Sequence, residues 1–438
     1  MKKTFKPHRA MAEAGRCLFC HDAPCVRGCP VGIDIPGFIR RLSQRNFAGA
    51  ARLIRTANPF GAVCARVCPA EVLCEKSCTS SGLAEPIAIA DLQRFAMEHA
   101  VARAGSASPK PVPTGRSVGV IGAGPAGLSA ALLLAQEGHS VTVFEAEQEP
   151  GGIMRYGIPS YRLPKEVVRA EVEQVERAGV EIRLGVTVGK DVPADSLLSS
   201  FDVVFIGAGL GKPLAPQLPG DEVAGVISAY SFLHHVSDPD GHGPHPDIPD
   251  PLGRVVVLGG GNVAVDAACV AKRLGADSVT IAYRRTQAEM PAWPREIEFA
   301  RQEGVEFEFL ISPVEVIGAD GKVIGVKVAH MRLEGTDESG RARPVPAGEP
   351  DELIGADTVI LAFGQGPNEE VFRMFDGLER DARGMVWVDE KTGATSVPGV
   401  FAGGDGVNGG STVVEAVAEG IRAARGISQY LRGATATS

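Results

Sequence analysis

The sequence is poor in aromatic residues and has no long apolar run. Aromatic side chains make up 5% of its 438 residues, whereas glycine occurs 54 times. This composition suits α/β nucleotide-binding domains, in which glycine lets a phosphate approach the backbone. No apolar stretch has the length of a membrane span, and the basic first residues lack the apolar core of a secretion signal. We therefore expect a cytoplasmic protein with no membrane association.

A surplus of basic residues is also missing. The formal net charge is −9, which disfavours binding to nucleic acid and to anionic membrane surfaces. The length predicts roughly two to four domains, each large enough to bury its own core.

Cysteine is almost absent after residue 78. Eight of the nine cysteines lie in two runs before that point, and only Cys269 lies outside them. We expect Cys269 to be a core residue of the helix that contains it. The first run is Cys17, Cys20, Cys25 and Cys29, and the second is Cys64, Cys68, Cys74 and Cys78. Each run contains a Cys-Pro pair, which is typical of ferredoxin-like iron–sulfur loops. Disulfides fit badly because nothing directs the chain to an oxidising compartment. Zinc stays open as an alternative, although the irregular gaps differ from the paired spacing of a zinc ribbon. We favour iron–sulfur ligation and therefore electron transfer.

The first hundred residues show no alternating strand pattern. Between residues 36 and 56 apolar side chains recur at helical spacing, with arginines on the opposite face. We therefore expect a small, mostly helical domain here. Residues 105–115 are rich in Gly, Ser and Pro, so we expect this stretch to be a linker that follows the helical domain.

A βαβ pattern begins at residue 118. A short apolar strand (118–121) leads into Gly122-Ala123-Gly124-Pro125-Ala126-Gly127, a helix is expected over 126–136, and a second strand (141–144) ends at Glu145. The glycines allow a tight turn and let a pyrophosphate approach the helix N-terminus, while the acid accepts a ribose hydroxyl. Because the strands, the helix and the acid occur in this order, the pattern predicts a dinucleotide site rather than an ordinary glycine turn.

The pattern occurs a second time. A strand (255–258) is followed by the turn Gly259-Gly260-Gly261-Asn262-Val263, a helix over 264–274 and another strand (279–283). This strand ends in Arg284-Arg285 instead of an acid, and arginine pairs with a 2′-phosphate where an acid would bind a 2′-hydroxyl. Two such units in one chain predict two different dinucleotides, the second being NADP(H) in preference to NAD(H).

Further strands are expected at 202–206, 358–362 and 400–402, the last leading into Gly403-Gly404-Asp405 and a helix over 411–431. In such an arrangement the acid binds the ribityl chain of a flavin, and the helix N-terminus faces the flavin. No closely spaced cysteine pair accompanies this part of the chain, which argues against a dithiol mechanism. The histidines between 234 and 245 could bind metal, but their irregular spacing among Asp, Pro and Gly favours a solvated insertion at residues 237–251.

These motifs together resemble a known family. Cys17-Leu-Phe-Cys20-His-Asp-Ala-Pro-Cys25, residues 33–39, residues 61–69 and Leu92-Gln93-Arg-Phe95 are similar to the electron-input part of dihydropyrimidine dehydrogenase, in particular to the bacterial flavin and iron–sulfur subunit of its NAD(P)-dependent form. The resemblance covers nearly the whole chain. The wider family includes glutamate synthase small subunits and NADPH:ferredoxin oxidoreductases, but the five residues between Cys68 and Cys74 match the dihydropyrimidine dehydrogenase branch.

The resemblance implies a set of ligands and cofactor contacts. One 4Fe-4S cluster would be held by Cys17, Cys20, Cys25 and Cys78, and the other by Cys29, Cys68, Cys74 and Gln93, with Cys64 free. FAD contacts would be Gly122, Ala123, Gly124, Pro125, Ala126, the stretch from Glu145 through Gly151, Gly152 and Ile153, Arg162, Gly404, Asp405 and Thr412. Nicotinamide nucleotide contacts would be Gly260, Gly261, Asn262, Val263, Arg284, Arg285, Ala362, Phe363 and Gly364. Pro291 stands where NADPH-using members have a further arginine.

The resemblance also implies the architecture and the activity. The expected fold is α/β, with a helical iron–sulfur domain (1–108) followed by two Rossmann-like domains, an FAD-binding one (116–221 and 363–438) and an NAD(P)-binding one (222–362) inserted in it. The expected activity is transfer of a hydride from NAD(P)H to FAD, then of electrons to an FMN and iron–sulfur barrel subunit that reduces uracil or thymine. We identify no catalytic side-chain acid or base. Two alternatives are a subunit serving another acceptor, such as glutamate synthase or ferredoxin, and a cluster-bearing binding subunit without hydride chemistry.

Overall fold

The computed structural model describes residues 5–101, 111–214, 218–237, 248–337 and 340–435. The chain forms two compact units: the first contains Met1–Arg155, Ser160–Gly211 and Pro367–Ser438, and the second contains Tyr156–Pro159 and Lys212–Gly366. Most of the predicted linker (residues 105–110), together with His242 and His245, lies outside the described residues. In the part of the chain that the structure describes, no helix is both long enough and apolar enough to cross a membrane.

The first unit begins with a helical domain. Its helices are α1 (Pro7–Gly15), α2 (Pro24–Arg27), α3 (Ile35–Ser43), α4 (Phe47–Ala57), α5 (Gly61–Val67), the 3-10 turn η1 (Thr79–Gly82) and α6 (Ile89–Val101). The helical stretch expected at 36–56 is two helices, because Arg45 has a positive φ of 62° and the Asn46 side chain caps the second helix by accepting a hydrogen bond from the backbone N–H of Gly49. Phe38, Leu42 and Phe95 are fully buried in the core of this domain.

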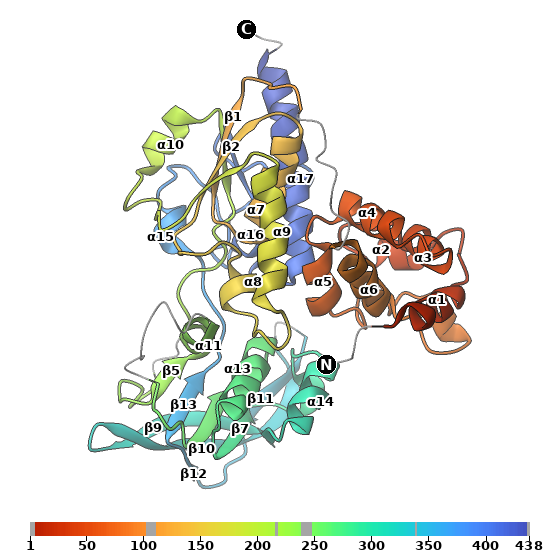
Figure 1. Ribbon diagram of the computed structural model, residues 1–438. Coiled ribbons are helices and arrows are strands. Elements are labelled where there is room, and N and C mark those ends of the chain that lie inside the picture. The colour runs from red at the N-terminus through yellow and green to blue at the C-terminus, as the bar shows by residue number, and fades with distance from the viewer. Residues whose placement is uncertain (1–4, 102–110, 215–217, 238–247, 338–339, 436–438) are drawn as a thin grey trace. The chain divides into compact units, whose positions relative to one another are not determined.

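The rest of the first unit is built on a parallel sheet of five strands in the order β14-β4-β1-β2-β3, of which β1 and β2 are labelled in Figure 1. The strands are β1 (Ser117–Ile121), β2 (Ser140–Phe144), β3 (Glu181–Arg183), β4 (Val203–Ile206) and β14 (Val400–Ala402). The helices are α7 (Pro125–Gln136), α8 (Ile153–Tyr156, whose last residue belongs to the second unit), α9 (Lys165–Arg177), α10 (Ala194–Ser200), α15 (Glu369–Phe372), α16 (Asp405–Asn408) and α17 (Val413–Thr435). The strand order reverses beside β1, which is where open parallel sheets bind their ligands.

Helices cover both faces of this sheet. Helices α7 and α17 run side by side on one face (Figure 1), and residues along α17 such as Val417 and Ile427 are fully buried. They approach closely at Gly420, where a Cβ atom would lie 2.2 Å from the carbonyl oxygen of Ala126. On the other face Leu197 of α10 and Phe372 of α15 pack with Ile206 of β4. The sheet is therefore buried on both sides, as parallel sheets require.

The second unit repeats the parallel pattern and adds an antiparallel sheet. The parallel strands follow the order β5-β13-β6-β7-β8, with bounds β5 (Val226–Ser228), β6 (Arg254–Leu258), β7 (Ser278–Tyr283), β8 (Glu306–Phe309) and β13 (Thr358–Leu361). The helices are α11 (Ala229–Ser237), α13 (Asn262–Arg273), η2 (Gln287–Glu289) and α14 (Pro294–Gln302). The antiparallel strands are β9 (Ile311–Ala319), β10 (Lys322–Thr336), β11 (Ala342–Pro346) and β12 (Glu352–Gly355).

The fold class expected from the sequence is confirmed: a helical N-terminal domain precedes two parallel-sheet units, and the second is inserted in the first. The predicted strands at 118–121, 141–144, 255–258, 279–283 and 400–402 are present within one residue at each end. The antiparallel sheet of β9 to β12 was not predicted from the sequence.

Candidate functional site

The glycine-rich turn between β1 and α7 is shaped to leave backbone N–H groups open at the helix N-terminus. Gly122 has a φ of +94°, and a Cβ atom there would lie 2.6 Å from the carbonyl oxygen of Gly207. Gly127 has no room for a side chain either, since its Cβ would lie 2.0 Å from the carbonyl oxygen of Gly122. At Gly124, the N-cap of α7, nothing lies within 4 Å of a Cβ position and no side chain caps the helix. The turn is therefore a cradle for an anion such as a pyrophosphate.

Glu145 lies at the end of β2 and faces this turn. Its carboxylate accepts hydrogen bonds from the backbone N–H of Ala123 at 2.7 Å and of Glu147 at 2.9 Å. Burial raises the pKa of its carboxyl group above the usual value, although the two N–H groups oppose this. A carboxylate can accept about four hydrogen bonds. Glu145 thus fixes the glycine turn and keeps acceptor capacity for a ribose hydroxyl.

Two further predicted contacts border the same turn. The backbone N–H of Gly151 donates to the carbonyl oxygen of Ala123 at 2.9 Å. Gly152 has a φ of +51°, and a Cβ atom there would lie 2.9 Å from the Cα of Gly124. The segment that leads into Ile153 and α8 therefore contacts the backbone of the turn directly. Arg162 is half-buried further along the chain.

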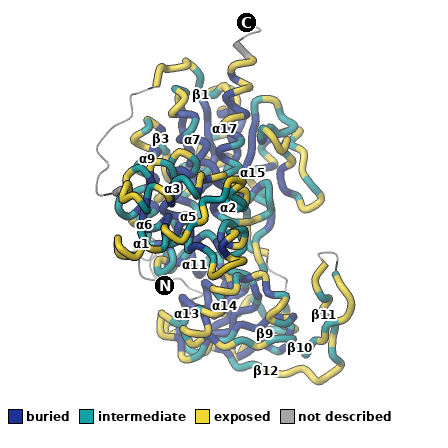
Figure 2. The backbone as a smooth tube through the Cα atoms, turned by 90° about the vertical axis from the view of Figure 1, so that its right-hand side faces the viewer, coloured by how far each residue is buried: buried dark blue, intermediate teal, exposed yellow. Residues whose placement is uncertain are grey.

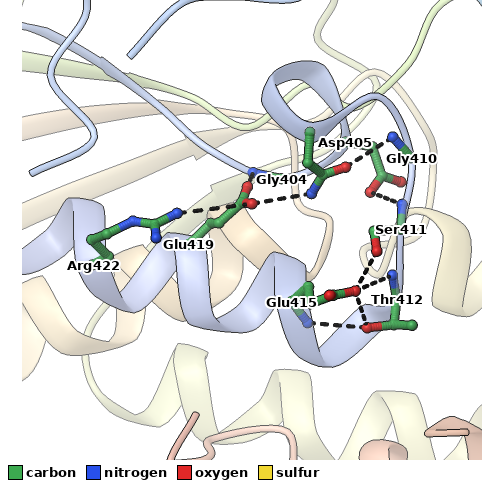
Figure 3. Close-up of polar contacts among 9 residues, drawn as sticks. Gly404, Asp405, Gly410, Ser411, Thr412, Glu415, Glu419 and Arg422 are labelled. Carbon is green, nitrogen blue, oxygen red and sulfur yellow. Dashed lines mark hydrogen bonds and ion pairs between the residues drawn. The ribbon is translucent and has the colours of Figure 1, made fainter. Parts of the chain in front are cut away.

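The segment after β14 presents a half-buried carboxylate, Asp405, beside the N-terminus of α17 (Figure 3). Asp405 accepts a hydrogen bond from the backbone N–H of Ser411 at 3.3 Å, and burial raises the pKa of its carboxyl group. Thr412 is the N-cap of α17, where its hydroxyl accepts from the backbone N–H of Glu415 at 3.3 Å while Glu415 Oε2 accepts from the backbone N–H of Thr412 at 3.0 Å. The hydroxyl of Thr412 also donates to Glu415 at 2.6 Å. This reciprocal capping box uses the side chain expected to contact a flavin.

Sequence reasoning missed two acids at this place. Glu415 is one, and Glu419 one turn later is the other (Figure 3). Glu419 Oε2 accepts a hydrogen bond from the backbone N–H of Gly404 at 2.5 Å, and Oε1 accepts from the Asn408 side chain at 3.2 Å. The Thr-x-x-Glu spacing could have revealed Glu415. No sequence signal distinguishes Glu419, whose role is to fix the loop that carries Asp405.

The turn between β6 and α13 is a second cradle. At Gly259 a Cβ atom would lie 2.4 Å from the carbonyl oxygen of Ala362, so this turn contacts the residue that follows β13. Gly261 is the N-cap of α13, and nothing lies within 4 Å of its Cβ position. Asn262 accepts a hydrogen bond from the backbone N–H of Trp293 at 2.9 Å. The next residue, Val263, is 46% exposed, which is unusual for valine at the first turn of a largely buried helix.

The two arginines after β7 lie in different surroundings. Arg285 is 3% exposed, and its guanidinium donates to the carbonyl oxygen of Ala342 at 2.7 Å and pairs with Asp337. Arg284 is exposed, and within the described part of the chain it forms no hydrogen bond or ion pair with another side chain. Arg285 is therefore committed to holding β11 against β7, whereas the charge of Arg284 is available to a ligand.

The cysteines of the helical domain influence one another in two overlapping groups, because Cys25 of the first group also raises the pKa of Cys74 in the second. Burial raises the pKa of Cys25 to about 11, and the neighbouring thiols of Cys78 and Cys17 add to the effect. Cys17 in turn has Cys78 and Cys20 as neighbours.

The second group contains Cys29, Cys68 and Cys74 together with Cys64. Burial raises the pKa of Cys29 and of Cys74, and a hydrogen bond with the Cys64 side chain is the largest cause of the raised pKa of Cys68. Cys64 is buried and packed among the ligand candidates.

Both groups fit iron–sulfur clusters chemically. Several thiols crowded in a partly buried place resist deprotonation, and a bound cluster supplies the positive charge that makes them thiolates. Among the described residues no group of three or more His, Cys, Asp or Glu side chains is arranged to hold a metal ion. The ligands of a four-iron cluster each bind a different iron and do not converge on one point.

Gln93 is held in one orientation beside the second group. It is 7% exposed, and its Nε2 donates a hydrogen bond to the carbonyl oxygen of Gly61 at 2.8 Å. Gly61 begins α5, which carries Cys64 and is followed by Cys68. Since the amide nitrogen is engaged, Oε1 is the atom left to act as a ligand.

Two family models match the chain. The model described as pyridine nucleotide-disulphide oxidoreductase matches residues 116–420. The model described as dihydropyrimidine dehydrogenase domain II, 4Fe-4S cluster, matches residues 1–104.

Curated relatives match over nearly the whole chain. The glutamate synthase (NADPH) small chain of Halomonas elongata is 40% identical over 98% of this chain and 92% of its own length. The NAD-dependent dihydropyrimidine dehydrogenase subunit PreT of Escherichia coli K12 is 38% identical over 97% of this chain and 95% of its own length. The NADP(+)-dependent formate dehydrogenase subunit beta of Moorella thermoacetica is 40% identical over 94% of this chain, which spans only 60% of that relative.

Solved structures are similar at the level of the fold. Mycobacterium tuberculosis FprA in complex with NADPH has a TM-score of 0.61 at 20% identity, covering 74% of this chain and 86% of that one. The thioredoxin reductase of T. acidophilum has a TM-score of 0.55 at 22% identity, covering 73% of this chain and 99% of that one.

Proposed function

Because the chain belongs to the pyridine nucleotide-disulphide oxidoreductase family and carries the iron–sulfur domain of dihydropyrimidine dehydrogenase, we propose that it is the electron-input subunit of a dihydropyrimidine dehydrogenase. Family membership itself implies an NAD(P)H-dependent oxidoreductase with FAD and a 4Fe-4S cluster. The number of clusters, the preference for NADPH and the partner are parts of the proposal. The observations that carry it are the match over 97% of this chain to a dihydropyrimidine dehydrogenase subunit and the match of residues 1–104, which contain both cysteine runs, to the iron–sulfur domain model.

The cofactors supply the redox chemistry, in which a flavin accepts a hydride and a four-iron cluster carries single electrons. The chain's own residues bind and orient them. The open N–H groups at Gly124 bind the FAD pyrophosphate, Glu145 orients the adenosine ribose, and Asp405 holds the ribityl chain. The N–H groups at Gly261 bind the pyrophosphate of the nicotinamide nucleotide in the same way.

The charge of Arg284 supports a preference for NADPH. An exposed guanidinium at the end of β7 lies where a 2′-phosphate is read in such folds. Arg285 adds no free charge to this contact, because its guanidinium is buried and paired with Asp337.

We propose that Cys17, Cys20, Cys25 and Cys78 hold one cluster and that Cys29, Cys68, Cys74 and Gln93 hold the other. The nearness of Cys17, Cys25 and Cys78 to one another supports the first set, and the orientation of the Gln93 amide supports its place in the second. Cys64 would then be a neighbour that hydrogen-bonds Cys68 without binding iron.

The proposed partner is an FMN and iron–sulfur subunit that reduces uracil and thymine, and the proposed location is the cytoplasm. The experiment is co-expression with such a subunit, followed by an assay for dihydrouracil and dihydrothymine with NADPH. The chain alone should reduce artificial acceptors and leave both pyrimidines unchanged.

A second candidate is the small chain of a glutamate synthase, favoured by 40% identity over 98% of this chain to such a protein. A parallel assay with 2-oxoglutarate, glutamine and the large glutamate synthase chain separates the two candidates. Formation of glutamate without dihydrouracil would decide for glutamate synthase.

A further inference from the structure

A buried carboxylate joins the helical domain to the flavin-binding part of the first unit. Glu171 lies on α9 and is 3% exposed. Its Oε1 accepts a hydrogen bond from the backbone N–H of Ala62 at 2.7 Å, and its Oε2 accepts one from the backbone N–H of Val63 at 3.1 Å. Both N–H groups belong to the first turn of α5. Glu171 was not among the site residues predicted from the sequence.

The Glu171 carboxylate caps the N-terminus of α5, although Glu171 is distant from α5 in the sequence. The N-cap residue of α5 is Phe60, which offers no side-chain hydrogen bond to the helix. The first N–H groups of a helix lack partners within the helix and need an acceptor. Glu171 supplies it from 108 and 109 residues away. Capping α5 therefore requires that α9 and α5 lie together.

Helix α5 is the element on which the second cysteine group depends. It carries Cys64 and ends directly before Cys68. The carbonyl oxygen of Gly61 at its first residue accepts the hydrogen bond that orients Gln93. A Cβ atom at Gly61 would lie 2.7 Å from the Ile54 side chain, so α5 is packed without slack against α4. A displacement of this first turn would therefore move Gln93 and Cys68 together.

Burying this carboxylate costs stability. Burial raises the pKa of Glu171 to about 7, although the N–H groups of Ala62 and Val63 and the charges of Arg55 and Arg66 oppose the shift. Replacing a buried charged residue by a well-packed apolar one often leaves the stability of the protein unchanged or increases it. The benefit of a carboxylate here is geometric, because its two oxygens fix two successive N–H groups at once.

We propose that Glu171 is a positioning residue for electron transfer, holding α5, and through it Cys68 and Gln93, in a fixed place against the flavin-binding domain. The proposal rests on the proposed function, since it takes Cys68 and Gln93 as cluster ligands. Glu171 does not touch a ligand itself and acts through the backbone of α5. Its expected effect is on the step from flavin to cluster and not on the step from nucleotide to flavin.

The test compares two variants in the purified, cofactor-loaded chain. Glu171→Gln keeps the shape of the side chain but leaves one oxygen to accept, with an NH2 group facing the other N–H. The control is Glu173→Gln on the same helix, whose side chain is 45% exposed and pairs only at the surface with Arg169 and Arg177. Stopped-flow absorbance after mixing with NADPH follows flavin bleaching and cluster reduction separately. Iron content and hydrogen exchange of the α5 amides are measured on the same samples.

In Glu171→Gln we expect flavin bleaching at the wild-type rate and full iron content. The α5 amides should exchange faster. Cluster reduction should be slowed by at least about tenfold, since a small misplacement of the cluster ligands costs a large factor in rate. Glu173→Gln should match the wild type in every measurement. Cluster reduction at the wild-type rate in Glu171→Gln would overturn the proposal. So would a loss of iron together with equal slowing of both steps, because Glu171 would then be only structural. Failure of the proposed function looks different: the wild type itself would show no bleaching by NADPH or would contain no iron.

Discussion

Arg285 and Asp337 form an ion pair that fixes the guanidinium of Arg285 in the interior of the second unit, with Arg285 3% exposed and Asp337 25% exposed. The same guanidinium donates to the carbonyl oxygen of Ala342 at the start of β11. The adjacent Arg284 is exposed. Two neighbouring arginines that look equivalent in the sequence therefore have separate roles, one in holding a strand and one at the surface beside the nucleotide turn.

The first prediction concerns coenzyme preference. Arg284→Ala should raise the Kd for NADPH by about tenfold or more while changing the Kd for NADH by less than about twofold, because a charge-assisted contact to a phosphate contributes on the order of 1.5–3 kcal/mol. The measurement is flavin bleaching titrated with each nucleotide. If the wild type already binds NADH better, Pro291 was the more informative residue and the NADPH assignment is wrong.

The matched control for that experiment is Asp337→Asn. It removes the partner of Arg285 and leaves a buried guanidinium without its counter-charge, so it should lower the Tm measurably. The ratio of the two Kd values should stay at the wild-type level, because Asp337 only holds the β11 side of the fold.

The second prediction separates the cluster ligands. Anaerobically purified protein should contain about eight iron atoms and about eight acid-labile sulfides per chain if both clusters have four irons. Cys64→Ala should retain all of this iron, whereas Cys74→Ala should lose about half of it and destabilise the helical domain. Equal loss in the two variants would show that Cys64 is a ligand in place of Gln93. One or two zinc ions per chain with no visible cluster absorbance would defeat the iron–sulfur assignment altogether.

The sequence predicted those parts of the molecule whose signal is local. The strands that flank the glycine turns were placed within one residue, because a run of buried β-branched residues ending at a glycine turn has few alternatives. The antiparallel strands β9 to β12 were not recognised, because bulges interrupt the register of β10 and no residue of β11 is buried, as Figure 2 shows. The alternation of apolar and polar residues along these strands is therefore weak.

The residues of the candidate site also fall into those that a local sequence motif reveals and those that only the fold brings together. The nucleotide turns and the cysteine runs are motifs, so their residues could be named from the sequence alone. Glu171 and Glu419 could not, because each acts on backbone groups that only the folded chain brings to it. In the sequence Glu171 is one of several glutamates on an amphipathic helix, and nothing marks it as buried.

The third prediction concerns the cap of α17. Thr412→Ala removes the hydroxyl that accepts from the backbone N–H of Glu415 and should lower the stability by roughly 1 kcal/mol. Thr412→Ser keeps a hydroxyl and should restore most of this loss. If Thr412 also contacts the flavin, Thr412→Ala will release FAD more readily than Thr412→Ser on dilution, which fluorescence of free FAD measures. Equal FAD retention in both variants would restrict Thr412 to the capping role.

The last prediction follows from the raised pKa of Glu171. Burial raises it to about 7 in the folded protein, from an ordinary value near 4.5. The folded state therefore binds more protons than the unfolded state between these values, and stability falls as the pH rises through this window. At about 1.4 kcal/mol for each pKa unit the full effect is on the order of 3 kcal/mol. Arg55 and Arg66, which face Glu171 from α4 and α5, stay charged across the window and add no slope of their own.

Glu171→Gln removes this titration and provides the comparison. From about pH 5 to about pH 8 the Tm of the wild type should fall relative to that of Glu171→Gln, with the change complete just above pH 7. Glu173→Gln, altered at a surface carboxylate of the same helix, should keep the wild-type slope. Parallel Tm curves for the wild type and Glu171→Gln would mean that Glu171 has an ordinary pKa, with the effect of burial cancelled by the N–H groups of Ala62 and Val63 and the charges of Arg55 and Arg66. That outcome would contradict the raised pKa and leave the hydrogen bonds between α9 and α5 in place. A difference confined to this window would show that the carboxylate is buried at the place where the two domains meet, and that it ionises there at a cost in stability.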